Sequence, residues 1–362
     1  MTRLLITGGA GFVGSNLAVA LAGRQPDWEI VAFDNLHRKG SEMNLPRLEQ
    51  AGVDFVRGDV RELAELEALG EIDAMVECSA EPTVLAGLDG DTSFVVNTNL
   101  TGAYHCLELC RRHGAYMVFL STSRVYPIEP QAALAYDRAE TRFVLASEQP
   151  VAGASAAGIS EAFPLNGTRT LYGTTKLAAE LLIEEWHGSF GLSAVVNRCG
   201  VIAGPWQMGK VDQGVFTHWM LNHHFSEPLS YIGYGGSGMQ VRDLLHIDDL
   251  VDLVAEQLTD PGHWDGKVVN VGGGTDCSLS LLETTDLCRE ITGNEVPIPP
   301  VAEARQADVP IYLSDCARLF ELTEWRPRRS AEETLRDIEA WIAGNEDLVA
   351  ESLGFAARRV GN

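Results

Sequence analysis

Short apolar segments alternate with longer helical ones over residues 1–200 of the chain. Six of these segments have the length and the β-rich makeup of buried strands. They are residues 3–9, 29–35, 53–59, 74–80, 115–121 and 192–200. Between them, residues 13–24, 100–114 and 173–191 have helical patterns. This βαβ alternation predicts an α/β fold of the Rossmann type, a doubly wound parallel sheet with helices on both faces.

The alternation is interrupted at residues 127–170, which are rich in Ala, Pro and Gly. A connection of this length predicts a loop excursion near a binding site. After residue 201 the alternation weakens, so we expect a smaller C-terminal domain that binds the substrate. The predicted boundaries are 1–201 for the Rossmann domain, with 243–271 returning to it, and 202–242 and 272–362 for the second domain.

Charge and composition narrow the class of protein. The formal net charge of −24 argues against a nucleic-acid partner, because phosphates require a basic surface. The predicted strand at residues 3–9 leaves no room for a signal peptide, and no apolar run is long enough to span a bilayer. Seven cysteines are scattered without metal-binding spacing or a disulfide pattern. We therefore expect a cytoplasmic protein without a membrane partner.

A glycine-rich turn joins the first predicted strand to the first predicted helix. Gly9, Gly11 and Gly14 form the pattern G-x-G-x-x-G, which lets the backbone approach a pyrophosphate at a helix N-terminus. Asp34 ends the next predicted strand, where a carboxylate can bind the adenosine ribose of a dinucleotide. Glycines that serve only a tight turn are the alternative, and the position of Asp34 argues against it.

The choice of dinucleotide depends on the charges around Asp34. A carboxylate there would repel a 2′-phosphate, so we expect NAD rather than NADP. Arg38 and Lys39 are positively charged and lie close to Asp34 in the sequence. NADP therefore stays open as an alternative. Asp59 and Val60, after the third predicted strand, are candidates to flank the adenine.

Tyr172 and Lys176 lie four residues apart and therefore on one face of a predicted helix. A tyrosine with a pKa of ~10 is a poor base at neutral pH, but a neighbouring ammonium stabilises the phenolate. The segment STSRVY, residues 121–126, adds three hydroxyls and Arg124 at the end of the strand predicted for 115–121. Because ligands of open α/β sheets bind at the carboxyl ends of strands, both segments are candidates for one active site.

The glycine-rich turn, the hydroxyl residues after a core strand and the Tyr-x3-Lys pair together resemble the extended short-chain dehydrogenase/reductases. The resemblance covers nearly the whole chain. It implies a catalytic set in which Thr122 assists Tyr172 at the substrate oxygen and Lys176 also holds the nicotinamide ribose. The cofactor-binding residues that it implies are Gly8, Gly9, Gly11, Phe12, Val13, Gly14, Asp34, Asn35, Arg38, Asp59, Val60, Ser79, Ala80, Asn99, Tyr172 and Lys176.

Two stretches bear on the reaction within that family. The nucleotide-sugar dehydratases of the family carry Thr-Asp-Glu where this chain has Thr122-Ser123-Arg124, so the acid and base for elimination of water are missing. Residues 77–81, ECSAE, depart from the His-x-Ala-Ala-Gln stretch that relatives often have and put Glu81 near the nicotinamide. The first departure leaves hydride abstraction and return as the expected chemistry.

Further segments, among them FDNLHRKGSEMNL, NRCGVIAGPWQMGKVDQGVF and YIGYGGSGMQVRDLLHIDDL, resemble the CDP-tyvelose (CDP-paratose) 2-epimerases of the family. This resemblance implies oxidation at sugar C2, reorientation of the keto intermediate and return of the hydride, with NAD regenerated in each turnover. A nucleotide-sugar 4-epimerase is the alternative, because the same three catalytic residues serve either carbon. A non-catalytic NAD-binding regulator is a more distant one, since it predicts a broken Tyr-x3-Lys pair.

The resemblance also implies contacts to a nucleotide-diphosphate sugar, with a CDP-hexose favoured. Arginines and polar residues along the chain are the candidates, and each arginine could instead form a structural ion pair. The candidate substrate-binding residues are Ser123, Arg124, Asn197, Lys210, Gln213, Arg242 and Arg305. We expect no metal, because His218, His223 and His224 lack a third ligand and are better explained as helix-surface residues.

Two predicted helical segments bear on assembly. Residues 100–115 and 171–186 are apolar over more than one face, and members of the family pair such helices in a four-helix dimer interface. We therefore expect a homodimer or a homotetramer.

Overall fold

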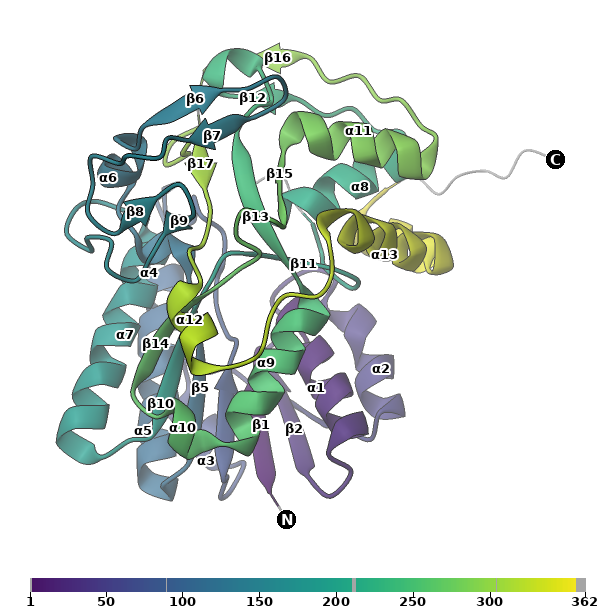
Figure 1. Cartoon of the computed structure of the whole chain (residues 1–362). Coiled ribbons are helices and arrows are strands. Elements are labelled where there is room, and N and C mark those ends of the chain that lie inside the picture. Colours follow the sequence, from purple (N-terminus) through teal and green to yellow (C-terminus); the bar gives the residue numbers. More distant parts are fainter. Residues whose placement is uncertain (1, 89, 210–212, 304, 356–362) are drawn as a thin grey trace. The chain divides into compact units, whose positions relative to one another are not determined.

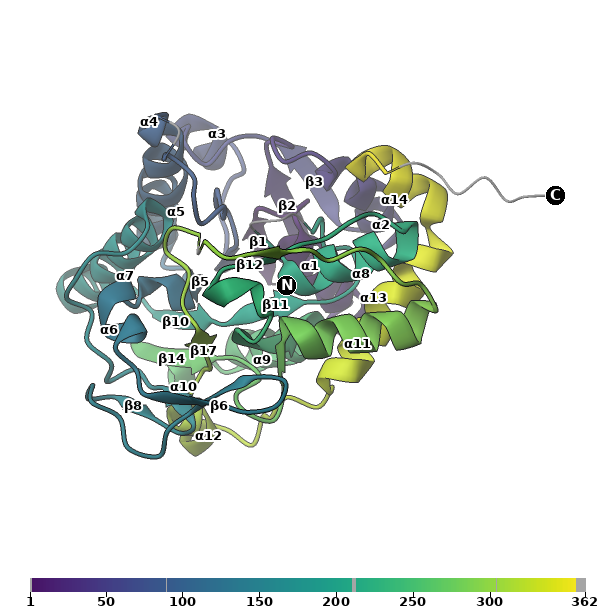
Figure 2. The same cartoon turned by 90° about the horizontal axis from the view of Figure 1, so that it is seen from above.

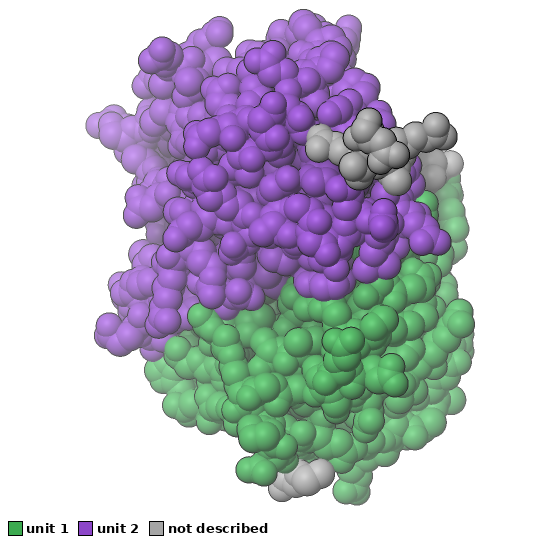
Figure 3. Space-filling view, turned by 90° about the vertical axis from the view of Figure 1, so that its right-hand side faces the viewer, with its two compact units in different colours: residues 1–125, 170–199, 250–269 green, residues 126–169, 200–249, 270–362 purple. Residues whose placement is uncertain are grey.

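The structure is a computed structural model of the chain that describes residues 2–88, 90–209, 213–303 and 305–355. The described residues fall into two compact units (Figure 3). Unit 1 comprises residues up to Val125, Thr170–Cys199 and Leu250–Val269. Unit 2 comprises Tyr126–Arg169, Gly200–Asp249 and the residues from Asn270 onward.

Unit 1 contains a seven-stranded sheet with the strand order β14-β10-β5-β4-β1-β2-β3 (Figure 1). The strands are β1 (Arg3–Thr7), β2 (Glu29–Asp34), β3 (Asp54–Arg57), β4 (Ala74–Glu77), β5 (Tyr116–Thr122), β10 (Ala194–Cys199) and β14 (Lys267–Val271). Each of the six strands from β3 to β10 pairs in parallel with its neighbour. The order reverses beside β1, the switch point at which such sheets bind dinucleotides. The predicted Rossmann-type fold is confirmed.

Helices surround this sheet. They are α1 (Phe12–Arg24), η1 (Ser41–Asn44), α2 (Leu45–Gln50), α3 (Leu63–Glu67), α4 (Thr92–Val96), η2 (Asn97–Thr101, a π-helix), α5 (Gly102–His113), η3 (Ser123–Val125), α7 (Leu171–Phe190), α9 (Ile247–Thr259) and α10 (Pro261–Trp264). Figures 1 and 2 both show α5 and α7 side by side. None of the helices among the described residues is long and apolar enough to cross a membrane.

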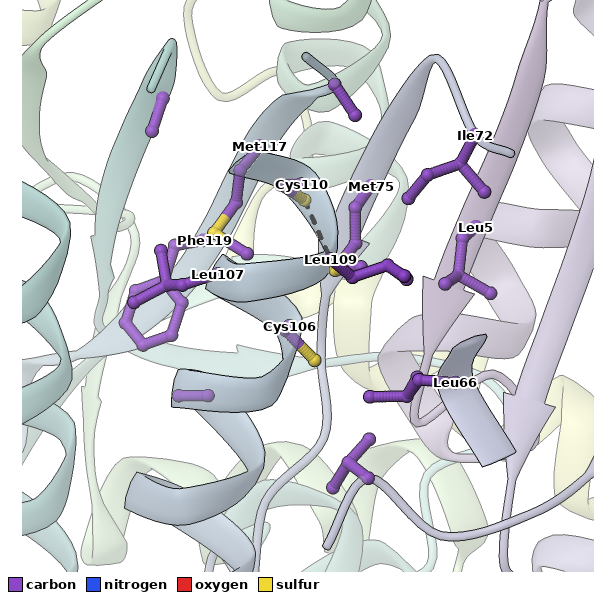
Figure 4. Packing of buried hydrophobic residues seen from close by; sticks show 14 of the residues in the cluster. Leu5, Leu66, Ile72, Met75, Cys106, Leu107, Leu109, Cys110, Met117 and Phe119 are labelled. Atoms are coloured by element: carbon purple, nitrogen blue, oxygen red, sulfur yellow. Dashed lines mark hydrogen bonds between the residues drawn. The ribbon is translucent and has the colours of Figure 1, made fainter. Parts of the chain in front are cut away.

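The core of unit 1 lies between the sheet and these two helices (Figure 4). Cys106 and Cys110 of α5 point toward Leu5, Met75 and the other apolar side chains of the strands. Both thiols are fully buried and act here as small apolar groups. Burial on both faces explains why most of the predicted strand segments are nearly continuous apolar runs, whereas the edge strand β3 is largely exposed.

Unit 2 is built around a smaller sheet in which β13 is central. β11 (Val201–Ala203), β13 (Val241–His246) and β15 (Ser278–Ser280) follow each other, and β17 (Ile311–Tyr312) also pairs with β13. The helices of this unit are α8 (Val215–Phe225), η4 (Tyr234–Gly236), α11 (Leu281–Thr292), α12 (Ala317–Leu322), α13 (Ala331–Gly344) and α14 (Glu346–Leu353), and a short parallel pair is formed by β12 (Tyr231–Ile232) and β16 (Pro300–Val301). Helices α8, α11 and α13 pack against one another.

Residues 127–170 contain more regular structure than the predicted loop excursion. They form α6 (Ile128–Ala132) and two antiparallel pairs, β6 (Tyr136–Arg138) with β7 (Phe143–Leu145) and β8 (Ala154–Ser155) with β9 (Gly158–Ile159). Arg142 anchors the first pair, because its guanidinium binds the Glu283 carboxylate and donates to the Ser278 carbonyl oxygen at 2.8 Å.

The unit boundaries differ from the predicted domain boundaries at this excursion. The prediction places it within the first domain, whereas residues 126–169 group with unit 2. The physical reason is the set of long-range contacts that the excursion makes, such as the Arg142–Glu283 ion pair and the hydrogen bond from Phe143 N to Met239 O at 3.0 Å. Residues 243–249 also belong to unit 2, while 250–269 return to unit 1. The role of the second domain in substrate binding stays a prediction.

Candidate active site

The turn between β1 and α1 is packed so tightly that its glycines cannot carry side chains. A Cβ on Gly14 would lie 2.3 Å from the Gly8 carbonyl oxygen, and a Cβ on Gly9 would lie 2.7 Å from Cα of Ala32 on β2. Gly8 has a φ of +63°, and its Cβ would lie 2.8 Å from the carbonyl oxygen of Cys78. Helix α1 then begins at Phe12, so its first N–H groups stand directly at the turn. These features fit a bound pyrophosphate.

Several predicted cofactor residues border this turn. The loop after β4, which carries Ser79 and Ala80, lies against Gly8. Gly11 is the residue that precedes α1, and Phe12 and Val13 are half-buried in its first turn.

Asp34, at the end of β2, faces the glycine-rich turn. Its Oδ2 accepts a hydrogen bond from Ala10 N at 3.2 Å, and its Oδ1 accepts one from Leu36 N at 2.7 Å. Burial raises the pKa of Asp34, while these backbone N–H groups oppose the rise. The carboxylate is therefore held at the switch point of the sheet, where the prediction places the adenosine ribose.

A second carboxylate lies on the same side of the turn. Asn35 Nδ2 donates to Asp59 Oδ2 at 2.9 Å, which joins the ends of β2 and β3. Desolvation raises the pKa of Asp59, but hydrogen bonds from Arg61 and Asn35 outweigh it and bring the pKa to about 2. Val60 is buried beside it, Arg38 is half-buried and Lys39 is exposed. Arg61 compensates the charge of Asp59, Nη2 to Oδ2 at 2.6 Å, so Asp34 is the carboxylate that favours NAD over the more negative NADP.

Tyr172 and Lys176 lie in the first two turns of α7. The helix begins after Thr170, whose hydroxyl oxygen accepts a hydrogen bond from Gly173 N at 3.2 Å. A Cβ on Gly173 would lie only 2.1 Å from the Arg124 carbonyl oxygen, so α7 starts in direct contact with the segment after β5. That contact brings Thr122 close to Tyr172, where its hydroxyl lowers the pKa of the phenol. The structure thus gathers the predicted catalytic set.

The charge state of Tyr172 is governed by competing effects. Desolvation raises the pKa of its phenol above the ordinary value. The Lys176 ammonium, the hydrogen bond with Thr122 and the Arg124 guanidinium lower it in turn. Thr122 is buried, and Ser123 and Arg124 are half-buried in η3.

Lys176 has a partner that the sequence did not indicate. Its Nζ donates to Glu77 Oε2 at 3.2 Å and lies 3.9 Å from the centroid of the Phe119 ring. Glu77 is the last residue of β4, and both charged side chains are only 2% exposed. In the sequence, residues 77–81 differ from the His-x-Ala-Ala-Gln stretch of relatives. The prediction names Glu81 as the unusual carboxylate there and does not name Glu77. A carboxylate at the end of an otherwise apolar strand was the available signal.

Ser121, the first residue of STSRVY, helps to attach helix α7 to the sheet. Its hydroxyl donates to Glu180 on α7, and Glu180 forms a buried ion pair with Arg198 on β10, Nη2 to Oε2 at 2.7 Å. These contacts fasten α7 to two strands of the sheet. Ser121 is therefore a structural residue.

Two asparagines that are predicted to contact ligands form hydrogen bonds with other residues of the protein. Asn197 is fully buried, and its side-chain amide exchanges two hydrogen bonds with that of Gln257, at 2.8 and 2.9 Å. The structure gives this amide a protein partner, and its contact to a diphosphate stays a prediction. Asn99 accepts from Glu81 N at 2.7 Å and donates to Thr175 Oγ1 at 3.2 Å, which ties the loop after β4 to α7.

The remaining predicted substrate residues belong to unit 2. Arg242 forms an ion pair with Asp308, Nη2 to Oδ1 at 2.6 Å, which is the structural alternative considered for it. Arg305 is half-buried. Gln213 is half-buried too, and its Oε1 has no hydrogen-bond partner among the described residues. Lys210 lies outside the described residues.

The histidines of α8 differ from expectation as well. His223 and His224 are buried rather than at the helix surface. His223 Nδ1 contacts Trp219 O at 2.8 Å, and His224 Nδ1 contacts Glu339 Oε1 on α13 at 2.8 Å. Within the described ranges, no group of three or more His, Cys, Asp or Glu side chains is placed to hold a metal ion.

Residues 4–272 match the model of the NAD dependent epimerase/dehydratase family. The chain belongs to this family. It is 28% identical over 353 residues to CDP-paratose 2-epimerase of Salmonella typhi, with 94% of this chain and 99% of that protein covered. It is 30% identical over 349 residues to dTDP-glucose 4,6-dehydratase of Mycobacterium tuberculosis, with 95% and 94% covered.

A solved structure is similar to this chain as well. The UDP-glucose 4-epimerase of Thermus thermophilus, solved with NAD, superimposes with a TM-score of 0.76 at 25% identity, over 95% of this chain and 99% of that one. The resemblance stated from the motifs is therefore confirmed, and so is NAD as the cofactor. The protein is an enzyme of the NAD-dependent nucleotide-sugar epimerase/dehydratase class.

Proposed function

We propose that this enzyme is an epimerase of a nucleotide-diphosphate sugar that inverts C2 of a CDP-hexose. The observation that carries the proposal is the segment after β5. It supplies Thr122 to Tyr172, as the family's chemistry requires, but continues with Ser123 and Arg124 where the dehydratases of the family have two carboxylates. Elimination of water needs that acid and base, whereas epimerisation does not.

The arrangement assigns a role to each catalytic residue. Tyr172 takes the proton from the sugar hydroxyl, and Thr122 donates its single O–H to the same sugar oxygen. Lys176 stabilises the phenolate by its charge. The glycine-rich turn would hold the pyrophosphate of NAD and Asp34 its adenosine ribose, and the bound cofactor would supply the acceptor and donor of the hydride.

The position on the sugar is supported by similarity to CDP-paratose 2-epimerase over 94% of the chain. Inversion at C4 is the second candidate, because the solved relative that acts on UDP-glucose at C4 shares the fold over 95% of the chain. The catalytic set serves either carbon. The pose of the sugar decides between them.

Product analysis tests the proposal. The enzyme is incubated with CDP-paratose, CDP-tyvelose and UDP-glucose in separate reactions, and each product is identified by NMR. We expect interconversion of the two CDP-sugars, with turnover lowered by ~10²–10⁴ in Tyr172→Phe. Inversion of UDP-glucose at C4 alone would move the enzyme to the second candidate. Loss of water from a sugar would contradict the epimerase.

A further inference from the structure

Glu77 forms a buried ion pair with Lys176, and no step of the proposed mechanism uses this carboxylate. The carboxylate lies at the end of β4, and the ammonium reaches it from α7 across the side chain of Phe119. Glu77 also accepts a hydrogen bond from Ser79 N. A buried pair of this kind is a weak source of stability, because desolvating two charges offsets most of their attraction. Its place beside the catalytic tyrosine suggests a different role.

We propose that Glu77 is a positioning residue that holds the Lys176 ammonium in place and sets the pH range in which Tyr172 acts as a base. The proposal rests on the function proposed above, in which Tyr172 is the base and Lys176 its cationic partner.

The sign of the effect follows from the charges. Lys176 lowers the pKa of Tyr172, because an ammonium stabilises a phenolate. An ionised Glu77 beside that ammonium cancels part of its field, and the phenolate then forms at a higher pH. Burial raises the pKa of Glu77, whereas Lys176 and the Ser79 N–H lower it. Burial is the larger effect, so the pKa of Glu77 stays above its ordinary value, and the Lys176 ammonium at 3.2 Å is the contact that favours the ionised carboxylate our proposal requires.

Other groups around the pair do not supply charge. Cys78 follows β4, Cys106 comes from α5 and Cys199 comes from β10. Burial raises the pKa of all three thiols, that of Cys199 to about 12, so they remain neutral at physiological pH. The charged groups that act on Tyr172 directly are therefore the Lys176 ammonium and the Arg124 guanidinium, and Glu77 acts through Lys176 in our proposal.

Glu77→Gln tests the proposal directly, because it removes the charge and keeps an oxygen that can accept from Lys176. The ionisation of Tyr172 is followed by the near-ultraviolet absorbance of tyrosinate in the NAD-saturated protein. Subtracting the titration of Tyr172→Phe, made in each background, isolates the one phenol. We expect the midpoint for Tyr172 to fall by about 1 pH unit in Glu77→Gln, and the acid limb of the pH–rate profile to fall with it. An unchanged or higher midpoint would overturn the proposal.

Two further variants keep the test decisive. If Glu77→Gln does not fold, Glu77→His takes its place, since relatives often carry histidine there, and the same fall is expected. In a Lys176→Met background, Glu77 loses its partner and takes up a proton. Adding Glu77→Gln there should then shift the Tyr172 midpoint by less than a third of its effect in the wild type. A full shift in that background would show that Glu77 does not act through Lys176.

Glu180→Gln is the matched control, since it also removes the carboxylate of a buried ion pair on α7. We expect it to lower the unfolding midpoint while moving the Tyr172 titration by less than half as much as Glu77→Gln. An equal shift would mean that any buried carboxylate has the effect. The titration needs no sugar substrate. A failure of the proposed epimerase activity therefore leaves this result standing, and a failure here leaves that activity untouched.

Discussion

Replacing Gly173 with alanine would push the start of the catalytic helix away from the segment that carries Thr122. The new Cβ would lie 2.1 Å from the Arg124 carbonyl oxygen, whereas real Cβ atoms essentially never come closer than 3.0 Å. Backbone must therefore move by about 1 Å, and overpacking of this kind costs roughly 1–3 kcal/mol. Tyr172 is the neighbouring residue, and a misplacement of about 1 Å lowers the rate by roughly 10²-fold.

Gly188→Ala, on the same helix, is the matched control. A Cβ added at Gly188 would meet no atom within 4 Å, and the residue is exposed, so alanine only improves helix propensity. We expect it to raise the free energy of unfolding by about 0.5–1 kcal/mol and to leave turnover unchanged. Urea unfolding and steady-state kinetics on both variants provide the comparison. Equal stability and equal turnover for the two variants would refute the tight contact between α7 and the segment after β5.

Three other outcomes follow from the site and the surface. Tyr172→Phe should lower turnover by ~10²–10⁴ while folding and NAD binding persist, and near-normal turnover would identify another base. Asp34→Ala should weaken NAD binding and reduce discrimination against NADP, measured by calorimetry; tighter binding of NADP to the wild type would contradict the role of Asp34. Leu181 on α7 is 58% exposed, and Leu181→Glu should dissociate a homodimer in light scattering, whereas Leu88→Glu, at a 55% exposed residue outside α5 and α7, should not. A monomeric wild type would refute the dimer.

Features that depend on neighbours in the sequence could be predicted. The glycine spacing, the strand that precedes it and the helix that follows are local, so Gly9, Gly11 and Gly14 are found in the turn where the pattern places them. The spacing of Tyr172 and Lys176 likewise fixes their common helix face. Such patterns specify a site because each residue is needed for a stated physical reason.

Features that depend on residues distant in the sequence could not be predicted. Glu77 and Lys176 are 99 positions apart, and nothing local marks them as partners. Asn197 has the polarity of a ligand-binding residue, but Gln257, 60 positions away, satisfies its amide. The excursion at 127–170 has the composition of a loop, while the ion pair from Arg142 to Glu283 attaches it to the second unit. In each case the tertiary fold brings together residues that are distant in the sequence, and composition gives no sign of it.

Hydride transfer without loss of hydrogen to water is the central claim, and a reaction in D₂O tests it most directly. The enzyme is given CDP-paratose or CDP-tyvelose in D₂O, and the product is examined by NMR at C2. The hydrogen abstracted from the sugar is returned to the same molecule, so the account predicts the C2 epimer with no deuterium at C2. In H₂O, substrate deuterated at C2 should keep its label. Stoichiometric solvent deuterium at C2 would contradict the account, because it would require proton abstraction from carbon.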